Sequence, residues 1–319
     1  MPEESTGVIL LNMGGPDSLK SVRPFLYNLF SDRDIIQLGP AFMQKYIAAF
    51  IAWRRAPKSG ENYRRIGGKS PLAEITAAQA AALAGQLQPH GRYYVTMAMR
   101  YWQPYPAEAL DFLLQKGVTR LVALTLYPQY SRATTGSSVK FLQQELARRS
   151  CSLPLTVIDS WPAQPQYLQV MATGILHEIH ELEQKGVVDI AVVYSAHSLP
   201  RSFIDQGDPY VDHLKESIAG IEKLTGRKGR LCYQSRSGPV EWLAPSTPEM
   251  LATLAAEGCK GVVMVPVSFV SDHVETLYEI DMLYRQMAEE YGMAFASSAS
   301  LNTNPDFIRA LAELVLDRN

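Results

Sequence analysis

The stretch GVTRLVALTLYPQYS (residues 117–131) has a counterpart, GCKGVVMVPVSFVSD (258–272), in the second half of the chain. Each begins with a glycine, continues into an apolar run and ends in a loop that carries serine. The offset from Gly117 to Gly258 is 141 residues in a chain of 319. After both stretches come a helix-like segment, a short strand and a loop with Trp-Pro or Asn-Pro. An order of elements that repeats in this way indicates that the two halves share one βαβ plan.

Short apolar segments alternate with longer helix-like segments along the whole chain. Eight of them are predicted as strands: 7–13, 93–99, 120–127, 154–159, 189–195, 230–235, 261–268 and 293–298. Continuous apolar strands separated by helices are typical of parallel sheets covered on both faces. We therefore predict an α/β protein with two doubly wound domains, residues 1–170 and 171–319, and a ligand cleft between them. Whether the last helix returns to the first domain stays open.

The composition excludes several classes of function. A content of 47% apolar and 19% charged residues is typical of a globular protein. The net charge of -2 argues against a nucleic-acid-binding protein, which needs an excess of Lys and Arg. The start, MPEESTG, lacks the apolar segment of a signal peptide, and no apolar run is long enough for a membrane span. Three widely spaced cysteines fit reduced thiols, so we expect a cytoplasmic protein.

His197 lies in the segment VVYSAHSLPRSF (192–203), where a buried strand is expected to end. A histidine at a strand end is often a hydrogen-bonded structural residue, and the residues alone do not exclude that role. The alternative is a proton acceptor at the edge of the cleft, because imidazole titrates near neutral pH.

The segment DHVETLYEID (272–281) is acidic. If it opens a helix, Asp272, Glu275 and Glu279 share one face at positions i, i+3 and i+7. A solvated helix face explains them in the plainest way. The alternative is a line of proton acceptors or metal ligands that faces the same cleft as His197.

The segment PAFMQKYIAAFIAW (40–53) carries large apolar residues at helical spacing, and residues 54–69 carry six Lys or Arg against one Glu. A core helix followed by a solvated loop is one interpretation. A segment that rests on an anionic membrane surface or holds an apolar ligand is the other.

Six motifs together resemble the ferrochelatase family, which completes haem synthesis. They are LNMGGPDSL (11–19), YRRIGGKSPL (63–72), YPQYSRATTGSS (127–138), SAHSLP (195–200), GDPY (207–210) and VPVSFVSDHVETLYEID (265–281). The resemblance runs in order from about residue 7 to the C-terminus. It implies two Rossmann-like domains with a porphyrin cleft between them, which agrees with the internal repeat.

The resemblance also implies roles for individual residues. His197 matches the active-site histidine of the family, and Glu275 the carboxylate that faces it; both are expected to bind Fe2+ transiently. Asp272, His273 and Glu279 match a polar trail that serves as a metal or proton path. The positions expected to bind porphyrin are Met13, Arg100, Tyr101, Tyr210, Trp242 and Phe269. Segment 40–53 resembles the apolar lip through which porphyrin enters and the enzyme touches the inner face of the cell membrane.

Two positions narrow the expected chemistry. Met13 resembles the branch that uses protoporphyrin, since family members that use coproporphyrin usually carry tyrosine there. Arg132 stands where some members have a cysteine that holds a [2Fe-2S] cluster, and no cysteine follows the last predicted helix. The expected substrates are therefore protoporphyrin IX and Fe2+, with no cluster and no tightly bound cofactor. The alternatives are a chelatase for coproporphyrin or a sirohydrochlorin-type tetrapyrrole, and a non-catalytic porphyrin or haem carrier.

Overall fold

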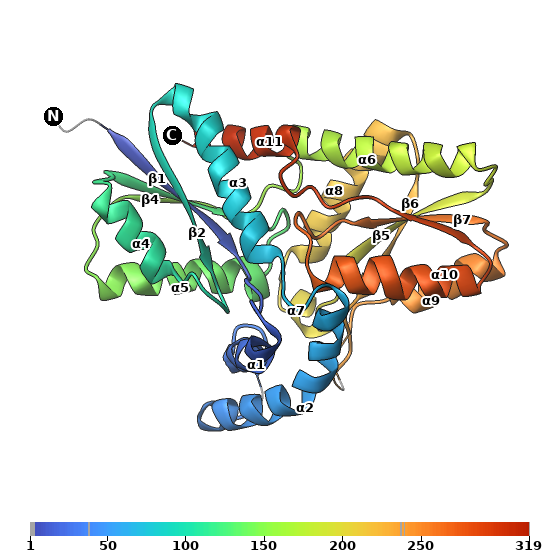
Figure 1. Cartoon of the computed structure of the whole chain (residues 1–319), viewed down its shortest axis with the longest axis horizontal. Coiled ribbons are helices and arrows are strands. Elements are labelled where there is room, and N and C mark those ends of the chain that lie inside the picture. The colour runs from blue at the N-terminus through green and yellow to red at the C-terminus, as the bar shows by residue number, and fades with distance from the viewer. Residues whose placement is uncertain (1–3, 38, 237, 239, 319) are drawn as a thin grey trace. The chain divides into compact units, whose positions relative to one another are not determined.

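The structure is a computed structural model that describes residues 4–37, 39–236, 238 and 240–318. It contains two compact units, one formed by residues 1–161 with 302–319 and the other by residues 162–301. Each unit is built on a parallel four-stranded sheet (Figure 1). All eight predicted strands are present, and the α/β fold class is confirmed.

The sheet of the first unit has the order β2-β1-β3-β4. Its strands are β1 (Ser5–Asn12), β2 (Arg92–Met99), β3 (Arg120–Thr125) and β4 (Leu155–Ile158). The helices of this unit are α1 (Val22–Ser31), α2 (Gln44–Arg65), α3 (Leu72–Leu87), α4 (Pro106–Gln115), α5 (Ser137–Arg148) and α11 (Pro305–Leu316). Figure 1 shows α3 and α11 on one face of the sheet and α4 and α5 on the other. Every residue of β1 is buried, because both faces of this central strand are covered.

The sheet of the second unit repeats this order as β6-β5-β7-β8. Its strands are β5 (Ile190–His197), β6 (Gly229–Gln234), β7 (Gly261–Pro266) and β8 (Ala294–Ser297). Its helices are α6 (Pro165–Gln184), α7 (Arg201–Asp205), α8 (Tyr210–Thr225), α9 (Thr247–Ala256), the π-helix η5 (Glu275–Tyr284) and α10 (Arg285–Glu290). Strands β1 and β5 occupy equivalent positions, as the internal repeat predicts.

The last helix of each half joins the unit of the other half. Helix α6 follows β4 in the chain but packs with α8 and the second sheet, and α11 follows β8 but packs on α3. The expected boundary between residues 170 and 171 falls within α6, whereas the two units divide after Trp161. The reason is the apolar face of α6, which buries Tyr167, Met171 and Ile175. A division inside this helix would expose that face to water.

Helix α2 differs most from its expectation. The basic segment after residue 53, a solvated loop in one of the two interpretations, continues the helix to Arg65. Pro57 lies inside the helix, where it removes one backbone donor, and Figure 1 shows α2 changing direction along its length. The interpretation of 40–53 as a core helix is wrong, because Phe50 and Trp53 are 58% and 57% exposed. The buried positions are instead Gln44, Ala48 and Ala52, one turn apart.

Candidate active site

His197 is the last residue of β5 and is held through its backbone. Its N–H donates to the Ser268 hydroxyl at 3.0 Å, and its carbonyl accepts from the Tyr210 hydroxyl at 3.0 Å. Tyr210 itself is buried. The His197 side chain keeps 39% of its surface exposed, so it is not a packed core residue. The strand end therefore fixes an imidazole that solvent or a ligand can reach.

Glu275, the first residue of η5, contacts the His197 ring. Its Oε2 lies 2.8 Å from His197 Nδ1. Burial of Glu275 opposes its ionisation, but the charge and hydrogen bond of His197, the charge of His273 and a hydrogen bond from Ser235 together hold the pKa of the carboxyl below its usual range. Conversely, burial lowers the pKa of His197, and the charge and hydrogen bond of Glu275 more than compensate, so the net pKa is raised. The two groups thus stabilise each other's charged forms.

Glu279 lies one helical turn beyond Glu275 and belongs to the same polar group. Its Oε2 accepts from the Ser235 hydroxyl at 2.7 Å, and the Tyr284 hydroxyl lies 3.4 Å away. Burial and the neighbouring charge of Glu275 raise the pKa of Glu279 above its usual value. Two carboxylates with pKa values shifted in opposite directions are an arrangement suited to acid–base chemistry.

The remaining predicted residues of this group lie in the loop between β7 and η5. Asp272, Glu275 and Glu279 are expected on one face of an α-helix. The helix instead starts at Glu275 and is a π-helix, with i to i+5 hydrogen bonding, so Asp272 lies outside it. Asp272 precedes the helix and accepts from the Thr276 hydroxyl at 3.1 Å. The Phe269 ring lies edge-on to His197, with centroids 6.5 Å apart, and 4.4 Å from the ring of His273. Burial lowers the pKa of His273, which favours a neutral ring.

Trp242 lies apart from these contacts. The backbone of Trp242 forms an isolated antiparallel β-bridge with Pro200. Its indole N–H donates to the Gly238 carbonyl at 3.3 Å. The bridge places Trp242 beside the segment that follows His197. Pro239, which belongs to the same GPVEW motif, lies outside the described residues.

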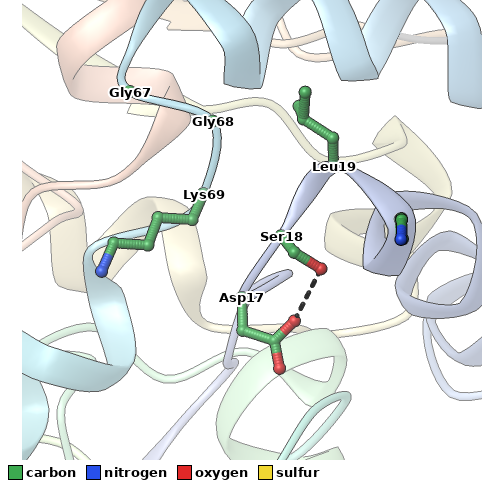
Figure 2. A pocket seen from close by; sticks show the side chains of 7 residues that line it. Asp17, Ser18, Leu19, Gly67, Gly68 and Lys69 are labelled. Atoms are coloured by element: carbon green, nitrogen blue, oxygen red, sulfur yellow. Dashed lines mark hydrogen bonds between the residues drawn. The ribbon is translucent and has the colours of Figure 1, made fainter.

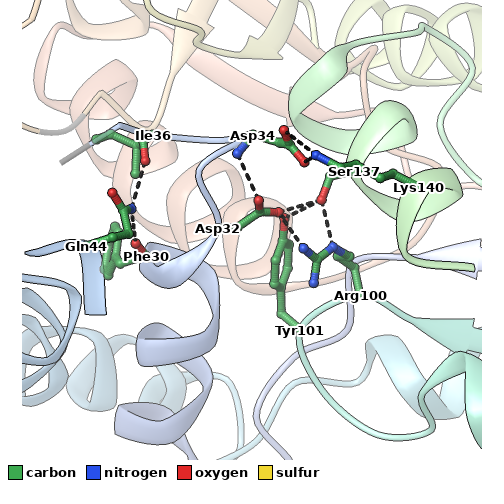
Figure 3. A network of polar contacts seen from close by, with 9 residues as sticks. All are labelled: Phe30, Asp32, Asp34, Ile36, Gln44, Arg100, Tyr101, Ser137 and Lys140. Atoms are coloured by element: carbon green, nitrogen blue, oxygen red, sulfur yellow. Dashed lines mark hydrogen bonds and ion pairs between the residues drawn. The ribbon is translucent and has the colours of Figure 1, made fainter. Parts of the chain in front are cut away.

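Arg100 and Tyr101 form a separate polar network in the first unit (Figure 3). Asp32 Oδ2 accepts from Arg100 Nη2 at 2.8 Å and from the Tyr101 hydroxyl at 2.7 Å. Arg100 Nε also donates to the Ser137 hydroxyl at 2.7 Å. Burial disfavours ionised Asp32, but hydrogen bonds from Ser137 and Tyr101 and the charge of Arg100 hold its pKa below the usual value. A cavity of about 250 Å³ borders Asp32, Arg100 and Ser137.

Met13 directly follows the last residue of β1. Its N–H donates to the Asn12 side chain at 2.8 Å, and its carbonyl accepts from the Tyr101 N–H at 2.9 Å. The loop beyond Met13 forms one wall of a depression of about 510 Å³, whose other wall is the 67–69 turn (Figure 2). Its lining residues are Asp17, Ser18, Leu19, Lys20, Gly67, Gly68 and Lys69. None of the predicted porphyrin-binding residues lines this depression.

Sequence reasoning missed three residues of these networks. Asp32, Ser137 and Ser235 are all buried or half-buried hydrogen-bonding partners of predicted site residues. For Ser235 a signal exists in the sequence, because it follows β6 just as His197 ends the neighbouring strand β5. Asp32 lies in a loop after α1 and carries no comparable signal.

In the part of the chain that the structure describes, no three His, Cys, Asp or Glu side chains gather into a set that could hold a metal ion. Within the same described residues, none of the helices combines the length and the apolar character needed to cross a membrane. The three cysteines are free thiols, and Arg132 begins the short π-helix η4 (Arg132–Gly136).

Comparison with known proteins gives the family. The family model described as Ferrochelatase matches residues 5–319. A ferrochelatase of Desulfotalea psychrophila is 61% identical over 312 residues, which cover 98% of this chain and 97% of the relative. One of Geobacter metallireducens is 50% identical over 317 residues, which cover 98% of each. The solved structure of SirB from Bacillus subtilis with Fe3+ has a TM-score of 0.52 at 14% identity, covers 76% of this chain and 89% of its own, and shows a shared fold. With a whole-chain family match and relatives of this similarity, the chain belongs to the ferrochelatase family, whose members insert ferrous iron into porphyrin for haem synthesis.

Proposed function

We propose that this enzyme inserts Fe2+ into protoporphyrin IX and that His197 accepts the pyrrole protons. The observation that carries the assignment is the 2.8 Å contact between His197 Nδ1 and Glu275 Oε2. In the neutral ring, a hydrogen on Nδ1 that donates to Glu275 leaves Nε2 as a free acceptor. The 39% exposure of the side chain allows a substrate to reach it.

Metal insertion requires two N–H protons to leave the macrocycle as one divalent ion enters. When Nε2 of His197 takes a proton, the imidazolium is stabilised by the carboxylate of Glu275. Glu275 and Glu279 then provide acceptors through which each proton leaves. The products are protohaem and two protons, so charge and atoms balance. Fe2+ is a substrate, and we infer that His197 and Glu275 bind it transiently, with Asp272, His273 and Glu279 along its path.

We infer that the porphyrin binds at the carboxyl ends of the strands. In parallel α/β sheets, ligands bind beyond the carboxyl ends of the strands. His197 stands at that end of β5, and Met13 follows that end of β1. Phe269, Trp242 and Arg100 would provide contacts to the macrocycle and its carboxylates. Tyr101 and Tyr210 are buried and hydrogen-bonded, and would support the pocket wall from behind.

We further infer a peripheral contact with the inner face of the cell membrane through segment 40–53, in a protein of the cytoplasm. Its exposed apolar side chains, Phe42, Tyr46, Phe50 and Trp53, support this contact. The exposed Arg54 and Lys58 follow directly and suit an anionic headgroup surface.

The test of the function is metallation of protoporphyrin IX by Fe2+, followed by absorbance. We expect His197→Ala to lower turnover by about 10²–10⁴-fold, the usual effect of removing a general base. His177→Ala, an exposed histidine on α6, is the matched control and should retain turnover. Near-normal turnover of His197→Ala would remove His197 from the chemistry. A wild-type protein that binds the porphyrin without metallating it would be a carrier, and one that metallates only coproporphyrin or sirohydrochlorin would have a different substrate.

A further inference from the structure

Ser235 follows the last residue of β6 and has an unusual backbone. Its φ is 62°, in the left-handed region that residues other than glycine rarely adopt. Such a conformation persists where surrounding contacts hold it, and it occurs often at functional sites. The contacts of Ser235 identify what holds it.

The Ser235 hydroxyl lies between the two carboxylates of η5. Its Oγ is 2.9 Å from Glu275 Oε2 and 2.7 Å from Glu279 Oε2. The same oxygen of Glu275 contacts His197 Nδ1. The four side chains thus form a continuous chain from His197 through Glu275 and Ser235 to Glu279. A hydroxyl suits the central place because it has one proton to donate and lone pairs to accept.

The side chain of the preceding residue, Gln234, joins β5 to the start of η5. Gln234 Oε1 accepts from the Ser195 hydroxyl at 2.6 Å, and Gln234 Nε2 donates to the Glu275 carbonyl at 3.2 Å. Gln234 therefore fixes where η5 begins, and Ser235 contacts the carboxylates that the helix carries. Gln234 Nε2 also donates to Glu279 Oε2 at 3.5 Å, so both neighbours contact this carboxylate.

We propose that Ser235 is a positioning residue of the metallation site, whose hydroxyl fixes Glu275 against His197 and sets its distance from Glu279. The proposal rests on the function proposed above for His197 and Glu275. Without the hydroxyl, the two carboxylates lose a shared hydrogen-bond partner and Glu275 can rotate away from the imidazole. Binding of the porphyrin itself does not depend on this hydroxyl.

Three substitutions separate the hydroxyl from the backbone. Ser235→Gly and Ser235→Ala both remove the hydroxyl, but glycine adopts a positive φ without strain. Ser235→Thr keeps the hydroxyl, and its branched side chain is strained at this φ. Stability should therefore be highest for the glycine variant and lowest for the threonine variant. Activity should follow the opposite order.

The experiment measures kcat, porphyrin KM and the thermal unfolding midpoint for these variants in the full-length enzyme. We expect kcat to fall about 10–100-fold for Ser235→Gly and Ser235→Ala, as for other residues that orient a site, with KM little changed. Ser235→Thr should retain most of the wild-type kcat, although its thermal unfolding midpoint is lower. The control is Ser202→Ala, at an exposed serine of α7, which should leave kcat, KM and the unfolding midpoint unchanged. The inference is overturned if kcat follows stability, or if the glycine variant keeps wild-type kcat. His197→Ala in the same assay tests the proposed function separately, since its full activity would overturn that function whatever the Ser235 variants do.

Discussion

His197 Nδ1 and Glu275 Oε2 lie 2.8 Å apart although 78 residues separate them in the sequence. Their contact follows from strand order, because β5 and β7 are hydrogen-bonded neighbours and both loops start from the same edge of the sheet. Ser268, in the loop after β7, also accepts the N–H of His197. The parallel pairing of two strands thus builds an acid–base pair from segments that are far apart in the chain.

The first prediction concerns Glu275→Gln, which removes the charge beside His197 and keeps the shape of the side chain. We expect the pKa of His197 to fall below its ordinary value of 6.5, because burial lowers it and the main opposing charge is gone. An NMR titration of the His197 ring measures this pKa. Glu279→Gln is the matched comparison and should lower the pKa less, since Glu279 contributes less than Glu275. An unchanged His197 pKa in Glu275→Gln would contradict the coupling.

The second prediction concerns the buried carboxylate of Asp32. Asp32→Asn should reduce the free energy of unfolding by about 1.5–3 kcal/mol at pH 7, the range for hydrogen bonds to a charged group. The pKa of Asp32 is lower in the folded state than its ordinary value of 3.8, so its stabilisation is complete above that pH. It is lost as the pH falls through the folded pKa. Urea unfolding at pH 7 and pH 3 should therefore show a difference that shrinks in acid.

The control for Asp32 is its near neighbour Asp34, which pairs with the exposed Lys140. Asp34→Asn should change the free energy of unfolding by less than about 1 kcal/mol, as exposed ion pairs contribute little. Equal effects of the two substitutions, or a difference for Asp32→Asn that is as large at pH 3 as at pH 7, would count against the buried network.

The sequence predicts the eight strands and the repeat, because these depend on apolar runs and on strand order. The residues alone leave the pairing of His197 with Glu275 as one of two alternatives, and the family resemblance implies it. The sequence does not predict that α6 joins the second unit and leaves open whether α11 returns to the first, because both depend on long-range packing. Nor does it predict the π-helix, since Glu275 and Glu279 fit an α-helix equally well by spacing. In α2 the usual rule fails: Gln44 is buried and the aromatic residues are exposed. A hydrophobic pattern identifies the apolar face of a helix, but not whether that face meets the core, a ligand or a membrane.

The third prediction concerns the buried amide of Gln44 in α2. Gln44 is 2% exposed, and its Nε2 donates to the carbonyls of Phe30 and Ile36, each at 2.9 Å. Gln44→Leu leaves both carbonyls without this donor and should reduce the free energy of unfolding by about 1–3 kcal/mol. The neighbouring exposed residue gives the control, since Lys45→Ala should stay within about 0.5 kcal/mol of wild type. Equal stability of Gln44→Leu and wild type in urea would show that the buried amide is dispensable.

The fourth prediction tests the exposed apolar face of α2. Phe50 and Trp53 lie on this face with ring centroids 6.0 Å apart. Replacing both with Ser should weaken sedimentation with anionic liposomes and raise the porphyrin KM, because the double variant removes apolar surface available to lipid and substrate. The unfolding midpoint should change little, since neither ring is in the core. Phe112 and Leu114, exposed apolar residues at α4, give the matched control when replaced with Ser, and should leave liposome binding intact. If the Phe50 and Trp53 variant bound liposomes and porphyrin as wild type does, neither the membrane nor the porphyrin would use this face.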